Sequence, residues 1–267
     1  MLRVGFFQFN PLFGKVQRNL QYIIEKLKNV NTDLMVLPEL AFTGYQFKDR
    51  AELNIVAEDS SDSPTIKALC DLCAQKNMFL VTGFAERQRE NIFNASLLLG
   101  SKGLIHTYRK IQLFYKEKDL FTPGNLPLQV HEVLGVKIGM MVCFDWIFPE
   151  VTRVLALQGA DIICHPANLV LSYCQEAMIT RCLENNIFTI TANRFGTEKR
   201  PHGIMKFTGR SQIVAPKGKL VFRAKAQREE LFITEIDPFL AKDKRITEKN
   251  DIFQDRRPEF YDKISEI

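Results

Sequence analysis

Short apolar runs alternate with amphipathic stretches along this chain, a pattern typical of an α/β protein. Residues 3–9 and 33–37 read as buried strands. Between them, residues 18–28 place their apolar side chains on one helical face. The chain therefore opens with a predicted β-α-β unit.

The same alternation continues to residue 236. Gly100 to Gly103 and Pro216 to Lys219 carry residues suited to hairpin turns. We expect further strands over 78–84, 136–142, 161–164, 187–191 and 231–236, and helices over 64–76, 149–159 and 175–185. The sequence has no Pro/Ser-rich linker, low-complexity tract or short-period repeat. We therefore predict one domain, residues 1–267, built of two similar β/α halves.

The last stretch, residues 244–267, differs from the rest because it is charged. Its outstanding apolar residues are Ile252, Phe253, Phe260 and Tyr261. Two interpretations stay open. The stretch is a frayed terminus, or its aromatic residues and the adjacent Arg256 and Arg257 pack on a partner subunit. The second interpretation predicts a homodimer or a higher homo-oligomer.

Composition narrows the function classes. A chain of 267 residues that is 46% hydrophobic and 25% charged can bury a full core. The net charge of +5 is spread along the chain without a basic cluster interleaved with aromatics, so we expect no nucleic-acid partner. No apolar run approaches the roughly 20 residues of a membrane span, and residues 1–10 lack the features of a secretory signal. We expect a cytoplasmic protein that does not bind membranes.

The cysteines and histidines do not suggest disulfides or a metal. In a chain of this size without a signal peptide, reduced thiols are the default. Cys70 and Cys73 share the apolar face of the helix predicted over 64–76, which favours packing over redox chemistry. The four histidines form no pair with metal-ligand spacing, so we expect no metal site.

Cys143 is the first candidate for chemistry. It follows the strand predicted over 136–142 and precedes a helix whose first turn suits Pro149. A thiol at such a junction is held by the sheet, and the backbone N–H groups after it are free to face a ligand. An isolated cysteine is nevertheless usually a packing residue.

Two other segments, each with charged residues, support a catalytic role for Cys143. Glu39 follows a buried strand through Pro38, where burial would raise the pKa of its carboxyl and suit it to a general base. Lys110 ends an alternating strand, and Glu117 follows in the same loop region. Each alone is more often a surface residue. Together they supply what a thiol needs, because its free pKa is about 8.5 and a base and a nearby cation both favour the thiolate.

Three segments resemble the signature motifs of the nitrilase superfamily, the carbon-nitrogen hydrolases. They are Pro38-Glu39, Tyr108-Arg109-Lys110, and Cys143-Phe144-Asp145-Trp146 with Phe148-Pro149-Glu150. The resemblance covers nearly the whole chain and is most specific to the small thermophilic archaeal nitrilases. It implies a four-layer αββα sandwich, with Glu39 as general base, Lys110 as electrophilic stabiliser, Cys143 as nucleophile and Glu117 orienting the lysine. It implies no metal or organic cofactor.

The implied reaction converts a small aliphatic nitrile or amide to the carboxylic acid and ammonia through a thioester, with the backbone N–H of Phe144 helping Lys110 hold the developing charge. Many branches carry an arginine near the end of the cysteine motif, where this chain has Trp146-Ile147. An apolar wall favours small neutral substrates. Asn168 and Tyr45 are further candidates for the wall, although Tyr45 also fits a packing role. The alternatives are an amidase or carbamoyl-amide hydrolase without nitrile activity, and a binding protein that retains the fold.

Overall fold

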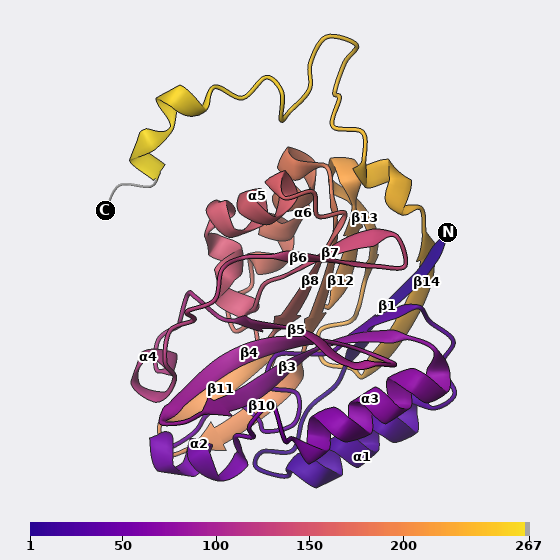
Figure 1. Cartoon of the computed structure of the whole chain (residues 1–267). Coiled ribbons are helices and arrows are strands. Elements are labelled where there is room, and N and C mark those ends of the chain that lie inside the picture. The colour runs from indigo at the N-terminus through magenta and orange to yellow at the C-terminus, as the bar shows by residue number, and fades with distance from the viewer. Residues whose placement is uncertain (265–267) are drawn as a thin grey trace.

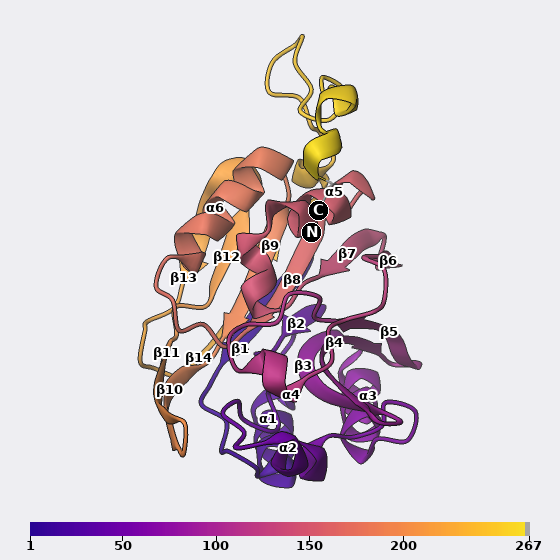
Figure 2. The same cartoon turned by 90° about the vertical axis from the view of Figure 1, so that its left-hand side faces the viewer.

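Two six-stranded mixed sheets, packed face to face, form the centre of the structure, a computed structural model that describes residues 1–264 (Figures 1 and 2). The first sheet has the order β14-β1-β2-β3-β4-β5. Its strands are β1 (Leu2–Gln8), β2 (Leu34–Val36), β3 (Phe79–Gln88), β4 (Asn91–Gly100), β5 (Gly103–Arg109) and β14 (Glu230–Ile236). The second sheet has the order β13-β12-β9-β8-β7-β6. Its strands are β6 (Val130–Val133), β7 (Val136–Met140), β8 (Ile162–Ala167), β9 (Phe188–Asn193), β12 (Gln212–Ala215) and β13 (Lys219–Arg223).

Helices cover the outer face of each sheet. On the first lie α1 (Val16–Leu27) and α3 (Pro64–Lys76), and on the second lie α5 (Pro149–Leu157) and α6 (Cys174–Asn185), as Figures 1 and 2 show. The sequence marks the start of two of these helices: Ser63 caps α3 through a bond from the Ile66 N–H, and Pro149 opens α5. The predicted αββα sandwich of two similar halves is confirmed.

The apolar core is divided into clusters. One cluster runs from the space between the sheets through the second sheet to α5 and α6, and a second lies between the first sheet and α1 and α3. Cys73 is buried in this second cluster and Cys70 packs against it, which confirms the packing interpretation of the pair. All six cysteines are free thiols.

Several elements were not predicted. They are α2 (Arg50–Val56), the one-turn α4 (Glu117–Leu120), the strand β6, the hairpin of β10 (Phe195–Arg200) and β11 (Gly203–Thr208), and the 3-10 helices η1 (Cys143–Ile147), η2 (Pro216–Gly218), η3 (Pro238–Ala241), η4 (Pro258–Phe260) and η5 (Asp262–Ile264). The strand predicted over 136–142 ends at Met140, because the Val142 N–H bonds the Asp145 side chain instead of continuing the ladder.

The last described residues leave the body of the sandwich (Figures 1 and 2). Phe253 still packs against the core, with the Arg153 guanidinium 5.4 Å from its ring centroid. Phe260 is 67% exposed. The tail is therefore anchored at Phe253 and exposes aromatic surface beyond it; residues 265–267 lie outside the described part. Within residues 1–264, no helix is long and apolar enough to cross a membrane.

Candidate active site

The three candidate residues that are far apart in sequence meet at one edge of the sandwich. Glu39 follows β2 in the first sheet, Lys110 directly follows β5, and Cys143 begins η1 just after β7 in the second sheet. Carboxyl ends of parallel strands are where catalytic groups converge in α/β folds. The three side chains come within interaction distance here, together with Glu117 from α4.

Lys110 is the centre of a buried charged cluster. Its Nζ lies 2.8 Å from Glu39 Oε1, and 2.8 Å and 2.7 Å from the two carboxylate oxygens of Glu117. The side chains of Lys110 and Glu39 are 0% exposed. Buried charges persist only when they are paired and hydrogen-bonded, so one ammonium between two carboxylates fixes all three side chains.

Uncharged donors fix the two carboxylates further. Asn94 Nδ2 donates to Glu39 Oε1 at 2.7 Å, and the Tyr45 hydroxyl donates to Glu117 Oε1 at 2.6 Å. The Phe114 N–H donates to Glu117 Oε2 at 2.9 Å. Glu39 Oε2 alone has no partner within residues 1–264. The cluster therefore holds Glu39 by one oxygen and leaves the other available.

Burial sets the protonation of the cluster. It raises the pKa of Glu39, although Lys110 opposes the effect. Burial also raises the pKa of the Cys143 thiol well above its ordinary value, with the Glu39 charge adding to it, so the resting sulfur carries its proton. Burial would lower the pKa of Lys110, but Glu117 and Glu39 outweigh it and the pKa is raised. The ammonium stays charged, and the thiol needs a base in order to react.

Cys143 sits in a left-handed backbone conformation with φ of 43°, which side chains other than glycine rarely adopt. Its carbonyl oxygen lies 2.9 Å from His165 Nε2. The Asp145 carboxylate holds the same turn by accepting from the Val142 N–H at 2.8 Å and the Tyr108 hydroxyl at 2.7 Å. The surrounding bonds therefore hold the nucleophile candidate in a strained turn.

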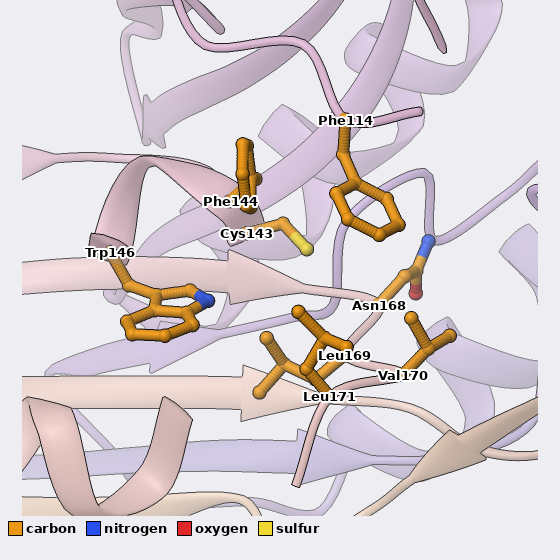
Figure 3. Close-up of a pocket in the computed structure, with 8 residues that line it drawn as sticks. All are labelled: Phe114, Cys143, Phe144, Trp146, Asn168, Leu169, Val170 and Leu171. Atoms are coloured by element: carbon orange, nitrogen blue, oxygen red, sulfur yellow. The ribbon is translucent and has the colours of Figure 1, made fainter. Parts of the chain in front are cut away.

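A mostly apolar cavity of about 230 Å³, part of it open to solvent, lies above the sulfur. Its lining residues are Phe114, Cys143, Phe144, Trp146, Asn168, Leu169, Val170 and Leu171. Figure 3 shows the Cys143 sulfur pointing into the space between Phe114 and Asn168. Phe144, Trp146 and Asn168, which the sequence predicts at the substrate site, all line this cavity.

Tyr45 lies elsewhere. It lines a second cavity, of about 640 Å³ of partly open space, together with Glu117, Lys116 and residues of β11. Tyr45 contacts the charged cluster through its hydrogen bond to Glu117, and it does not line the cavity at Cys143.

No group of three or more His, Cys, Asp or Glu side chains in residues 1–264 is arranged to hold a metal ion. Of the supporting residues, Asn94 had the clearest missed signal, since it is a buried amide inside a mostly apolar strand. Asp145 lies in the cysteine motif and His165 in β8, but the spacing of these residues does not reveal the bonds that they make to Tyr108 and to the Cys143 carbonyl.

Known proteins resemble this chain in sequence and in fold. A family model described as carbon-nitrogen hydrolase matches residues 3–245. A nitrilase of Pyrococcus abyssi is 41% identical over 98% of this chain and 99% of its own length. A solved carbon-nitrogen hydrolase of Helicobacter pylori superposes with a TM-score of 0.88 at 24% identity, covering 99% of this chain and 98% of its own. An amidase of Nesterenkonia sp. AN1, in which acrylamide is added to the active-site cysteine, superposes with a TM-score of 0.80 at 22% identity, covering 98% of this chain and 99% of its own.

Proposed function

This chain belongs to the carbon-nitrogen hydrolase family and is a hydrolase, and on that premise we propose that it converts a small aliphatic nitrile or amide to the carboxylic acid and ammonia, with Cys143 as the nucleophile. The observation that carries the proposal is the buried ammonium of Lys110 between Glu39 and Glu117 beside a buried, strained cysteine. A fold without catalysis has no need for three buried charges next to a thiol, since burial of charge is costly.

The first step is proton transfer from the thiol. Cys143 is protonated at rest, and the free Oε2 of Glu39 is the base that takes its proton as the sulfur attacks the substrate carbon. The raised pKa of Glu39 suits both parts of its task, because it accepts a proton here and returns it later.

The attack places negative charge on the substrate oxygen, or on the nitrogen of a nitrile. The Lys110 ammonium and the Phe144 N–H are the donors proposed for that charge, and one such donor contributes about 3 kcal/mol of barrier lowering. Glu117 keeps the ammonium in position by accepting a hydrogen bond from it, and the Tyr45 hydroxyl holds Glu117 by donating to its carboxylate.

The remaining steps regenerate the enzyme. From an amide, the tetrahedral intermediate collapses as Glu39 gives its proton to the departing nitrogen, which leaves as ammonia and a Cys143 thioester. From a nitrile, the first adduct is a thioimidate, and addition of one water followed by loss of ammonia yields the same thioester. A further water, deprotonated by Glu39, then attacks the thioester, and the sulfur recovers the proton as the acid leaves.

The cavity supports a small, neutral acyl group. Its wall holds no charged side chain among the described lining residues, and Trp146 is buried against Tyr173 with ring centroids 5.6 Å apart. The likeness to an amidase supports the second candidate, hydrolysis of amides or carbamoyl amides without nitrile activity.

The test measures ammonia released from matched pairs of nitriles and amides with C2–C4 acyl groups. We expect turnover of at least one series, and a covalent adduct on Cys143 by mass spectrometry of the quenched enzyme. Cys143→Ala should lose both, and unchanged turnover in that variant would refute the mechanism. Activity on amides alone selects the amidase, while absence of turnover and adduct leaves a binding protein.

We also propose a cytoplasmic homodimer or higher homo-oligomer. Outward apolar residues on α5 and α6, among them Leu157 at 42% and Leu183 at 57% exposure, support an interface between subunits, and Leu183 lies beside Ile246 and Ile252 of the tail. Light scattering after size exclusion measures the assembly, and Leu183→Glu should shift it toward the monomer. The six free thiols agree with a reducing compartment.

A further inference from the structure

The side chain of Asn168 is buried beside the nucleophile with its hydrogen-bonding capacity unused. Asn168 directly follows β8 and is 2% exposed. Within residues 1–264, neither its Nδ2 nor its Oδ1 has a hydrogen-bond partner. A buried amide without partners is costly, so such a group in a native site indicates a ligand that completes it.

Asn193, one strand away, provides a contrast. It ends β9, in register with Ala167, and its amide is fully used. Asn193 Nδ2 donates to Gly209 O at 2.6 Å and to Thr208 Oγ1 at 3.0 Å, and its Oδ1 accepts from the Leu169 N–H at 2.9 Å. The side-chain amide of Asn193 thus joins neighbouring segments of the fold through hydrogen bonds, whereas the side-chain amide of Asn168 does not.

The backbone prevents Asn168 from turning away. Its own N–H faces the Cys143 sulfur, where it counteracts the rise in the pKa of the thiol, and the next N–H, that of Leu169, is held by Asn193. With both peptide groups fixed, the Asn168 side chain stays in the wall of the cavity, close to the sulfur (Figure 3).

The cavity determines which group can pair with Asn168. Apart from Cys143 and the indole N–H of Trp146, the other described lining side chains are apolar. An amide offers one donor and one acceptor face, so a group that is itself donor and acceptor satisfies both. A carboxylate or an ammonium would satisfy one face only and would be buried without a counter-charge. An alkyl group would satisfy neither.

We propose that Asn168 binds a neutral donor–acceptor group, a hydroxyl or a second carboxamide, carried by the acyl part of the substrate. This inference rests on the proposed function and narrows its substrate class. The side chain flanks the carbon that would be bound to sulfur, so the polar group lies one or two bonds from that carbon.

The main test compares kcat/KM for 2-hydroxypropanamide and 2-methylpropanamide, which differ by a hydroxyl in place of a methyl, and for the corresponding nitriles. We expect the wild type to favour the hydroxyl substrate at least tenfold, about the factor for one net hydrogen bond. Asn168→Leu should bring that ratio to within about twofold of one. A wild-type ratio near one, or the same ratio in wild type and variant, would overturn the proposal.

Two further measurements do not depend on turnover. Calorimetry with the Cys143→Ala protein should show at least tenfold tighter binding of 2-hydroxypropanamide than of 2-methylpropanamide. If the wild type turns over neither series, the proposed function fails, and this binding ratio still decides the inference. Equal or absent binding of the two amides would overturn it.

Melting temperatures separate a ligand-binding asparagine from a structural one. Asn168→Leu removes two unpaired buried polar atoms and should raise the melting temperature by about 2–4 °C. Asn193→Leu breaks three bonds and should lower it. A lowered melting temperature in Asn168→Leu would show that its amide is already satisfied and would contradict the proposal.

Discussion

Replacing His165 by glutamine should make the fold less sensitive to acid. His165 lies in β8 and is fully buried. The Cys143 carbonyl oxygen can only accept a hydrogen bond, so Nε2 carries the imidazole proton and Nδ1 accepts from the Thr191 hydroxyl at 3.2 Å. Burial lowers the pKa of this imidazole from 6.5 to about 4, and the ring is neutral in the native protein.

The sign and size of the effect follow from linkage. Below pH 6.5 the unfolded chain binds a proton at His165 that the native protein refuses until about pH 4. The stability contributed by the neutral His165 is therefore fully present above pH 6.5 and is lost as the pH falls toward 4. The free energy of unfolding should fall by about 1.4 kcal/mol at pH 5.5 and about 2.5 kcal/mol at pH 4.5 from this group alone.

Urea unfolding of wild type and His165→Gln at pH 7.5, 6.5, 5.5 and 4.5 measures this fall in the free energy of unfolding. Trp146, the only tryptophan, is buried beside the nucleophile turn and reports unfolding by fluorescence. Glutamine keeps a donor for the Cys143 carbonyl, and His202→Gln controls for loss of an exposed histidine. Groups present in both proteins, such as Glu39 with its raised pKa, cancel in the comparison. Parallel stability curves for wild type and His165→Gln would refute the assignment.

Three other substitutions test the site. Glu39→Gln should fold, with a melting temperature close to wild type, yet lose about 10²–10⁴-fold in kcat; full activity would remove Glu39 from the mechanism. Tyr45→Phe deletes the 2.6 Å bond to Glu117, so kcat should fall about tenfold and the melting temperature by several degrees, and no change in either would show that the bond is idle. Gly83→Ala would place a methyl group 2.3 Å from Glu39 Cα, so both the activity and the melting temperature should drop. The control, Ser101→Ala at an exposed position, should lose neither. Wild-type behaviour of Gly83→Ala would contradict this packing.

The scaffold was predictable because its signals are local. Strand periodicity, the Ser63 cap and the turn glycines lie within a few residues of what they determine. The elements that escaped prediction depend on distant partners. The β10–β11 hairpin buries only Glu198 and Phe207 fully, and it is fixed by Glu198, which accepts from the Tyr45 and Gln46 N–H groups about 150 residues earlier in the chain.

The candidate chemistry shows the same division. Resemblance to a family indicated Glu39, Lys110 and Cys143, and the structure brings them together. Neither the role of Asn94 nor the idle amide of Asn168 could be found that way, because satisfaction of a polar group is a property of the folded surroundings.

A comparison of the two halves of the fold shows why the hydrophobic pattern predicts the scaffold but not the site. Asp33 and Asp161 make matching bonds, since the Asp33 carboxylate accepts from the Arg3 N–H at 2.8 Å and the Asp161 carboxylate from the Lys137 N–H at 3.0 Å. The strand pairings align β2 with β8.

In that alignment Pro38 corresponds to Pro166, but Glu39 corresponds to Ala167 and Leu40 to Asn168. The same strand-and-proline frame therefore ends in a carboxylate in one half and in an amide one position later in the other. Because the frame is shared and these end residues are not, the hydrophobic pattern predicts both sheets, whereas the chemistry depends on which side chain each half places at the edge where they meet.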